Sequence, residues 1–172
     1  SGFGWNLNKL NQIDPEHVYP FYLVSTNKAR QKYTKICCDH FCNDGTEMEF
    51  GYQNQKESYK VAVGTPVVCT RNDPTLKLKG IVNNWKASID HIATTGLLVT
   101  LKGIIYENDK WIEGTVILEA STFHAHFLPL YASTISKYQG GVIQGEYAIL
   151  ELDSHMCDKN NLYTSITRTT DY

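Results

Sequence analysis

The sequence predicts an α/β domain that carries an inserted β-rich module. Three stretches indicate this: an apolar run followed by a helical pattern at residues 21–42, short β-prone runs between residues 61 and about 128, and helix-compatible stretches around an apolar run at residues 134–169. Because α/β elements lie on both sides of the β-prone stretch, that stretch is predicted to be an insertion. The expected parts are residues 1–60, 61–128 and 129–172.

The first part is predicted to contain one strand and one helix. The apolar run at residues 21–24 fits a buried strand, and the Ser-Thr-Asn sequence at 25–27 can accept hydrogen bonds from the free amides of a helix. Apolar residues recur at helical spacing over residues 28–42, and Asn-Asp-Gly at 43–45 ends the pattern. Residues 46–60 are polar and weakly patterned, which predicts a loop.

The insertion is predicted to be a small antiparallel barrel or meander, since many short strands at this spacing are typical of such folds. Tyr106 and Trp111 are expected to pack in its core. The expected strands are residues 61–63, 66–70, 81–82, 97–101, 103–106, 111–112 and 115–118. The last part is expected to contain a helix-compatible stretch at 136–140, a buried strand at 147–152 and a helix at 159–169.

Composition and charge exclude several classes of protein. Sixteen Lys and Arg against eighteen Asp and Glu give a net charge of −2, which excludes a globally basic nucleic-acid binder but not a local basic surface. No apolar run approaches the ~20 residues of a membrane helix, and no signal peptide opens the chain. Ser1-Gly2 in place of a methionine suggests a piece of a longer protein.

The five cysteines have two interpretations. Their odd number and the adjacent Cys37-Cys38 pair favour reduced thiols in an intracellular, reducing compartment. The expected compartment is the cytoplasm or the nucleus, and for a viral protein it is the cytoplasm or nucleus of the host cell. The alternative is a zinc site formed by Cys37, Cys38, His40 and Cys42. That site lacks a second Cys/His pair at finger spacing, so no metal is expected.

The sequence lacks a phosphate-binding loop of the form G-x-x-x-x-G-K-[ST], so an autonomous ATPase is unexpected. Arginine is scarce, at three residues against thirteen lysines. Arg168 is therefore a candidate for bidentate phosphate binding, because its planar guanidinium matches a phosphate better than an ammonium does. The alternative is a solvated arginine near a helix end.

Two segments of the last part resemble motifs V and VI of superfamily 1 helicases. Residues 134–140 read T-I-S-K-Y-Q-G, and residues 162–168 read L-Y-T-S-I-T-R. The family patterns are roughly T-I-H-K-S-Q-G and L-Y-V-A-[LI]-[ST]-R, in the same order. Upstream, residues 22–27 resemble motif IV, and residues 63–73 resemble the G-x-x-V-[MI]-x-x-x-N-D stretch that opens an inserted barrel. The resemblance spans about residues 20–172. It points to the RecD/PIF branch (superfamily 1B) and to helicases of large DNA viruses.

This resemblance implies the C-terminal half of an ATP-dependent DNA helicase of replication or repair: a second RecA-like lobe with an inserted SH3-like barrel. It implies that ATP and Mg²⁺ bind in the full-length protein, between this lobe and an N-terminal ATPase lobe, and that the chain alone binds neither and is inactive. It implies an arginine finger at Arg168, a nucleotide-facing role for Gln139 and Gly140, and contact of Thr134 and Lys137 with single-stranded DNA. Primase or other replication proteins are further expected partners, and a membrane is not.

A basic stripe in the insertion is a second candidate for nucleic-acid contact. Trp85 beside it is expected to stack on a base. The stripe consists of Lys60, Arg71, Lys77, Lys79 and Lys86. The alternative is solvated lysines that protect strand edges.

Other function classes stay open. The chain could be a non-hydrolysing module that binds single-stranded nucleic acid or a replication partner, or a protein-interaction barrel. The residues that precede Ser1 in the natural gene product would separate a degenerate lobe from a piece of a helicase.

Overall fold

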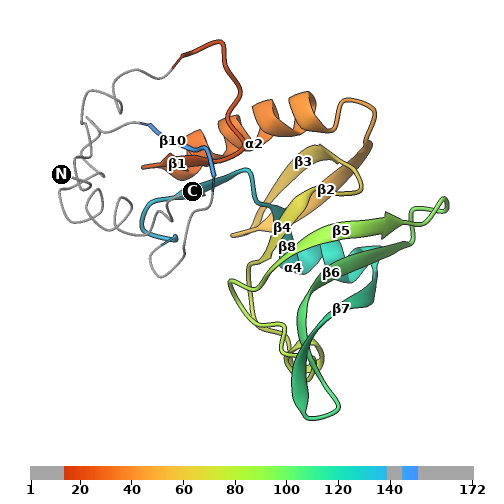
Figure 1. Cartoon of the computed structure of the whole chain (residues 1–172). Helices are drawn as coiled ribbons and strands as arrows, with labels where there is room; N and C mark the ends of the chain where they lie inside the picture. Colours follow the sequence, from red (N-terminus) through yellow and green to blue (C-terminus); the bar gives the residue numbers. More distant parts are fainter. Residues whose placement is uncertain (1–13, 139–144, 151–172) are drawn as a thin grey trace. The chain divides into compact units, whose positions relative to one another are not determined.

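The computed structural model describes residues 14–138 and 145–150 and has a mixed α/β fold, as the sequence predicts (Figure 1). It divides into two compact units. Unit 1 comprises the described residues up to Cys37 and from Tyr131 onward, and unit 2 comprises Cys38–Leu130. Unit 2 therefore begins earlier in the chain than the predicted insertion at residue 61.

Unit 1 contains a three-stranded parallel sheet in the order β10-β1-β9. Its strands are β1 (Tyr22–Val24), β9 (Ala132–Thr134) and β10 (Ala148–Ile149), and the helix α2 (Asn27–Phe41) follows β1. Strand β1 is buried on both faces, which explains its uninterrupted apolar sequence. The predicted helix cap is confirmed, because the Thr26 Oγ1 accepts a hydrogen bond from the Ala29 amide at 3.2 Å.

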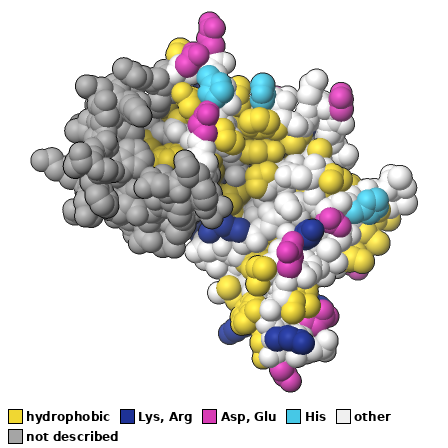
Figure 2. All heavy atoms as spheres, in the orientation of Figure 1, with side chains coloured by type: hydrophobic (Ala, Val, Ile, Leu, Met, Phe, Trp, Pro, Cys, Tyr) yellow, Lys and Arg dark blue, Asp and Glu magenta, His cyan; other side chains and the backbone are white. Residues whose placement is uncertain are grey.

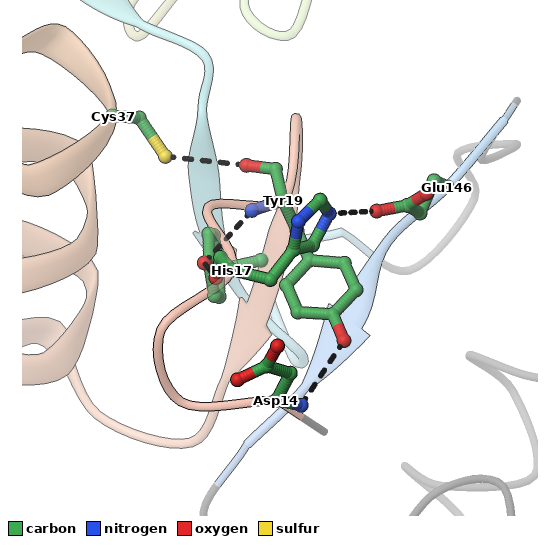
Figure 3. A network of polar contacts seen from close by, with 6 residues as sticks. Asp14, His17, Tyr19, Cys37 and Glu146 are labelled. Atoms are coloured by element: carbon green, nitrogen blue, oxygen red, sulfur yellow. Dashed lines mark hydrogen bonds and ion pairs between the residues drawn. The ribbon is translucent and has the colours of Figure 1, made fainter. Parts of the chain in front are cut away.

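A polar network holds the segment that precedes β1 (Figure 3). The His17 Nε2 lies 2.5 Å from the Glu146 Oε1, just before β10 in the chain. The Tyr19 hydroxyl accepts a hydrogen bond from the Asp14 amide at 3.4 Å, and the Tyr19 carbonyl accepts one from the Cys37 thiol at 3.5 Å. These contacts fasten the segment to α2 and to the amino end of β10.

Unit 2 consists of a hairpin and a five-stranded antiparallel sheet in the order β7-β6-β5-β4-β8. The hairpin strands are β2 (Thr46–Tyr52) and β3 (Gln55–Val61). The sheet strands are β4 (Pro66–Cys69), β5 (Lys86–Ile92), β6 (Leu98–Glu107), β7 (Lys110–Glu119) and β8 (Phe127–Pro129), with helices α3 (Pro74–Lys77) and α4 (Ala120–His126) between them. Within the described residues, β7 and β8 are edges of this sheet, and the predicted closed barrel is not found.

The hairpin corrects the prediction of a loop at residues 46–60. Strand β2 directs Met48 and Phe50 into the interior, and β3 directs Glu57 and Tyr59 there. The Glu57 carboxylate accepts a hydrogen bond from the Tyr59 hydroxyl at 2.5 Å, so the buried acid is satisfied. A glutamate on the inward face hides the alternation that identifies a strand.

An aromatic cluster forms the centre of unit 2. Phe123 of α4 stacks on Phe127 with ring centroids 5.5 Å apart, and Phe50 of β2 meets Phe123 edge to face at 5.5 Å. All three side chains are fully buried. The cluster joins the hairpin to α4 and the sheet, since it combines residues from β2, α4 and β8.

In the described part of the chain, no helix is long and apolar enough to cross a membrane.

Candidate nucleotide and nucleic-acid site

The carboxyl ends of β1 and β9 lie next to each other in unit 1. Val24 and Thr134 are register partners, and the Ile135 amide donates a hydrogen bond to the Val24 carbonyl at 2.8 Å. Open α/β sheets bind ligands outside the carboxyl ends of their strands. The residues that follow β1 and β9 therefore lie where this fold binds ligands.

Thr134 shapes a turn that presents Lys137. The Thr134 Oγ1 accepts a hydrogen bond from the Lys137 amide at 3.3 Å, and the Thr134 carbonyl accepts one from the Tyr138 amide at 3.1 Å. The Lys137 side chain is exposed. The Tyr138 ring packs against Phe21 at 5.0 Å, and its burial raises the pKa of the Tyr138 hydroxyl. The turn brings Thr134 and Lys137 together at the carboxyl edge.

Arg30 is a further candidate residue at the same edge, and no motif in the sequence identifies it. It lies in the first turn of α2, directly after β1, and only 6% of its surface is exposed. Its Nε donates a hydrogen bond to the Asn27 Oδ1 at 2.7 Å. A buried guanidinium must be paired or hydrogen-bonded, so its position is fixed. The scarcity of arginine was the one available signal.

Three predicted site residues lie outside the described residues. They are Gln139, Gly140 and Arg168.

The predicted basic stripe divides between two parts of unit 2. Four of its cations lie within residues 71–86, the segment that carries α3 and enters β5. They are Arg71, Lys77, Lys79 and Lys86, and all four are exposed. Asp73 is the only acidic residue in this segment. Partial burial lowers the pKa of the Lys86 ammonium. Lys60 lies on β3 of the hairpin, opposite Glu47, and belongs to a different sheet.

The Asn72-Asp73 pair fixes the loop that carries these cations. The Asn72 Oδ1 accepts a hydrogen bond from the Asn83 amide at 2.8 Å, which joins the two ends of the loop. The Asp73 Oδ1 accepts from the Thr75 and Leu76 amides at 2.9 and 3.1 Å and caps α3. The Asp73 Oδ2 also lies 3.4 Å from the His126 Nε2.

We expect Asp73 to make stability depend on pH in acid. The Leu76 and Thr75 amides, followed by His126 and Arg71, hold the pKa of the Asp73 carboxyl below its ordinary value of 3.8. The stabilisation is therefore complete above the unfolded-state pKa and is lost as the pH falls through the folded-state pKa. Asn is also a good cap. Asp73→Asn should flatten the fall in Tm between pH 5 and 2, measured by circular dichroism, and an unchanged profile would contradict this role.

The two tryptophans of unit 2 have different environments. The Trp85 Nε1 donates a hydrogen bond to the Ile104 carbonyl at 2.7 Å, and its ring meets Phe127 edge to face at 6.2 Å. Trp85 is thus half-buried and engaged with the sheet. Trp111 and Tyr106, which the sequence places in the core, are 61% and 38% exposed, so that expectation is wrong.

The cysteine-rich segment does not form a metal site in the described part of the chain, where no three His, Cys, Asp or Glu side chains are grouped to hold an ion. Cys37, Cys38 and Cys42 are buried and take part in no disulfide within the described residues, whereas His40 is exposed. Burial raises the pKa of the Cys37 thiol to about 12, and the Cys42 thiol contacts the Thr65 hydroxyl at 3.2 Å. These thiols behave as small core side chains.

No protein-family model and no curated protein matches the sequence significantly. Solved structures that share its fold include two Pif1 proteins. A Bacteroides Pif1 bound to single-stranded DNA has a TM-score of 0.58 and 14% identity, over 96% of this chain and 42% of that protein. The Pif1 helicase from Candida albicans has a TM-score of 0.52 and 12% identity, over 94% and 46%. The chain spans less than half the length of these helicases.

Proposed function

We propose that this chain is the C-terminal portion of an ATP-dependent DNA helicase of the Pif1-like branch of superfamily 1. The observation that carries the proposal is the carboxyl edge of the β10-β1-β9 sheet, where the Thr134 turn presents Lys137. The fold shared with two Pif1 proteins supports it. Thr134 and Lys137 are the segment whose sequence resembles motif V.

In this proposal, unit 1 is a second RecA-like lobe, and unit 2 is its inserted SH3-like module. ATP and Mg²⁺ bind between unit 1 and an N-terminal ATPase lobe. Gln139 and Gly140 face the nucleotide, and Arg168 stabilises the charge on the transferring γ-phosphoryl. The protein acts in DNA replication or repair inside the cell, with primase or other replication proteins as partners.

The role of unit 2 in this proposal is to hold single-stranded DNA. Arg71, Lys77, Lys79 and Lys86 are exposed and have a single acid among them in the sequence. Cations on such a surface bind phosphates and release condensed counterions. The Bacteroides Pif1 is itself bound to single-stranded DNA. This part of the proposal concerns only the described residues of the chain and can be tested directly.

We expect salt-sensitive binding of a labelled oligo(dT) by the chain. Four phosphate contacts predict that raising the salt from about 50 to about 200 mM weakens binding by roughly 50-fold. Replacing Lys77 and Lys79 together with glutamine should weaken binding and reduce the salt slope. Fluorescence anisotropy provides the measurement.

The matched control is Lys56→Gln, because Lys56 is an exposed lysine that pairs with a glutamate, as Lys79 does, but lies on β3 of the hairpin, outside the 71–86 segment. It should bind oligo(dT) like the unchanged chain. Binding that is absent at low salt, or equally strong at both salts, would contradict the proposed contact with DNA.

The second candidate function is a module that binds single-stranded nucleic acid without hydrolysing ATP. The lack of a phosphate-binding loop in the sequence is what this candidate predicts, and a piece of a longer helicase predicts it equally. DNA-stimulated ATP hydrolysis by the full-length protein separates the two, because only the helicase hydrolyses ATP.

A further inference from the structure

Trp111 and Tyr106 form an exposed aromatic pair near the turn that joins β6 to β7 (Figure 1). They are register partners on the two strands, and their ring centroids lie 5.2 Å apart at an interplanar angle of 56°. Trp111 is 61% exposed. An indole in this position offers a large apolar surface to a partner.

Gly80 supports the indole from beneath. A Cβ at Gly80 would lie 2.4 Å from the Trp111 Cζ3 and 2.6 Å from its Cη2, so the ring lies directly on the glycine backbone. The φ angle of Gly80 is +77°, which side chains rarely adopt. The Tyr106 amide donates a hydrogen bond to the Lys79 carbonyl at 2.8 Å, and the Lys79 ammonium lies 3.6 Å from the Glu107 carboxylate. These contacts hold the ring on a fixed support.

The ring therefore lies against Gly80, a residue of the basic segment at residues 71–86. Gly80 directly follows Lys79, and Lys77 lies two residues before that, while Lys110 precedes Trp111 on β7. Figure 2 shows hydrophobic, cationic and acidic side chains next to one another over unit 2. Single-stranded nucleic acid is the partner that this combination fits, because aromatic rings stack on bases and cations bind the phosphates between them.

We propose that Trp111 is a base-stacking residue for single-stranded DNA, supported by Gly80 and Tyr106 and flanked by the lysines of the α3 loop. This inference rests on the proposed function and names the side chain of unit 2 that receives a base. Trp85, the tryptophan expected from the sequence to do so, has its N–H bonded to Ile104 and its ring against Gly103. In this proposal Trp85 packs against the sheet, and Trp111 stacks on the base.

The test compares oligo(dT) binding by the chain and by Trp111→Ala, Trp111→Phe and Ile117→Ala. Trp111→Ala should weaken binding about tenfold at low salt, because stacking on one base contributes that much. Trp111→Phe retains an aromatic face and should keep most of the affinity. Ile117 lies on the same strand at 65% exposure, six residues away, so Ile117→Ala is the matched control and should bind normally.

The outcomes separate this inference from the proposed function. Equal binding by Trp111→Ala and the unchanged chain would overturn the stacking role and leave the lysine contacts standing, and the ring would then serve another partner. Equal losses in Trp111→Ala and Ile117→Ala would also overturn it. No binding by the unchanged chain at low salt would remove the proposed DNA contact and this inference together. Circular dichroism of each variant establishes that the fold is retained.

Discussion

Replacing Arg168 with alanine in the full-length protein is expected to abolish most ATP hydrolysis and to leave binding of single-stranded DNA nearly unchanged. An arginine finger meets negative charge that develops in the transition state, and its removal costs ~10³–10⁵ in rate. The expectation rests on the resemblance of residues 162–168 to motif VI, since Arg168 lies outside the described residues. DNA-stimulated ATPase assays give the rate.

Arg168→Lys is the informative companion variant. An ammonium carries the same charge but cannot form the planar, bidentate contact, so we expect little recovery of turnover. The alternative role, in which Arg168 interacts with a helix end, predicts a stability loss on the order of 1 kcal/mol and normal turnover. Wild-type turnover in Arg168→Ala would remove the assignment, and thermal unfolding of the same variant would then identify the structural role.

Replacing Phe123 with alanine is expected to give the largest loss of stability in unit 2. Phe123 is fully buried, stacks on Phe127 and meets Phe50 edge to face. Truncating a buried phenylalanine costs about 3–5 kcal/mol, from lost transfer free energy and the cavity left behind. That is a large part of the 5–15 kcal/mol by which a typical domain is stable. Urea unfolding followed by circular dichroism measures the loss.

The matched control is Ile117→Ala, which removes an exposed apolar side chain from the same unit. Such a substitution usually changes the free energy of unfolding by less than about 0.5 kcal/mol. Phe123→Leu should lie between the two, because leucine fills part of the cavity. A Phe123→Ala protein within about 1 kcal/mol of the unchanged chain would show that the cluster does not hold the hairpin and α4 on the sheet.

The local signals of the sequence located β1 and α2 of unit 1, whereas β9 was not predicted. The apolar run before Ser-Thr-Asn predicted β1, and helical spacing predicted α2 to within one residue at each end. The Thr26 cap follows from the same local chemistry. Each depends on residues within a few positions of one another, which is why the sequence carries the information.

The turn of the β2–β3 hairpin shows where local signals fail. Gln53 and Asn54 both adopt positive φ angles, of 49° and 61°, without the glycine that usually marks such a turn. The inward face of β3 contains Glu57, which becomes compatible with burial only through the Tyr59 hydroxyl. The alternating pattern is therefore interrupted on β3, although β2 keeps it at Met48, Phe50 and Tyr52.

The glycines of the sheet show that a local signal can also suggest a strand break where the strand is continuous. Gly114 was expected to lie between two short strands and Gly103 to begin one, yet they are register partners inside the continuous strands β6 and β7. The Trp85 ring packs against Gly103, and the Ile105 side chain packs against Gly114. A glycine in a strand often marks such a close approach rather than a break, and only the packing partner distinguishes the two.

Local sequence patterns are enough to predict the fold class and the strand and helix that begin unit 1, and they propose the segments in which phosphate-binding and DNA-binding residues lie. Which side chains in these segments are exposed depends on the packing of the folded chain. Trp85 and Trp111 are the same residue type beside similar neighbours, but one donates its N–H to Ile104 and the other rests on Gly80 in solvent. The reason is that burial depends on contacts between strands far apart in the sequence, which no local pattern encodes.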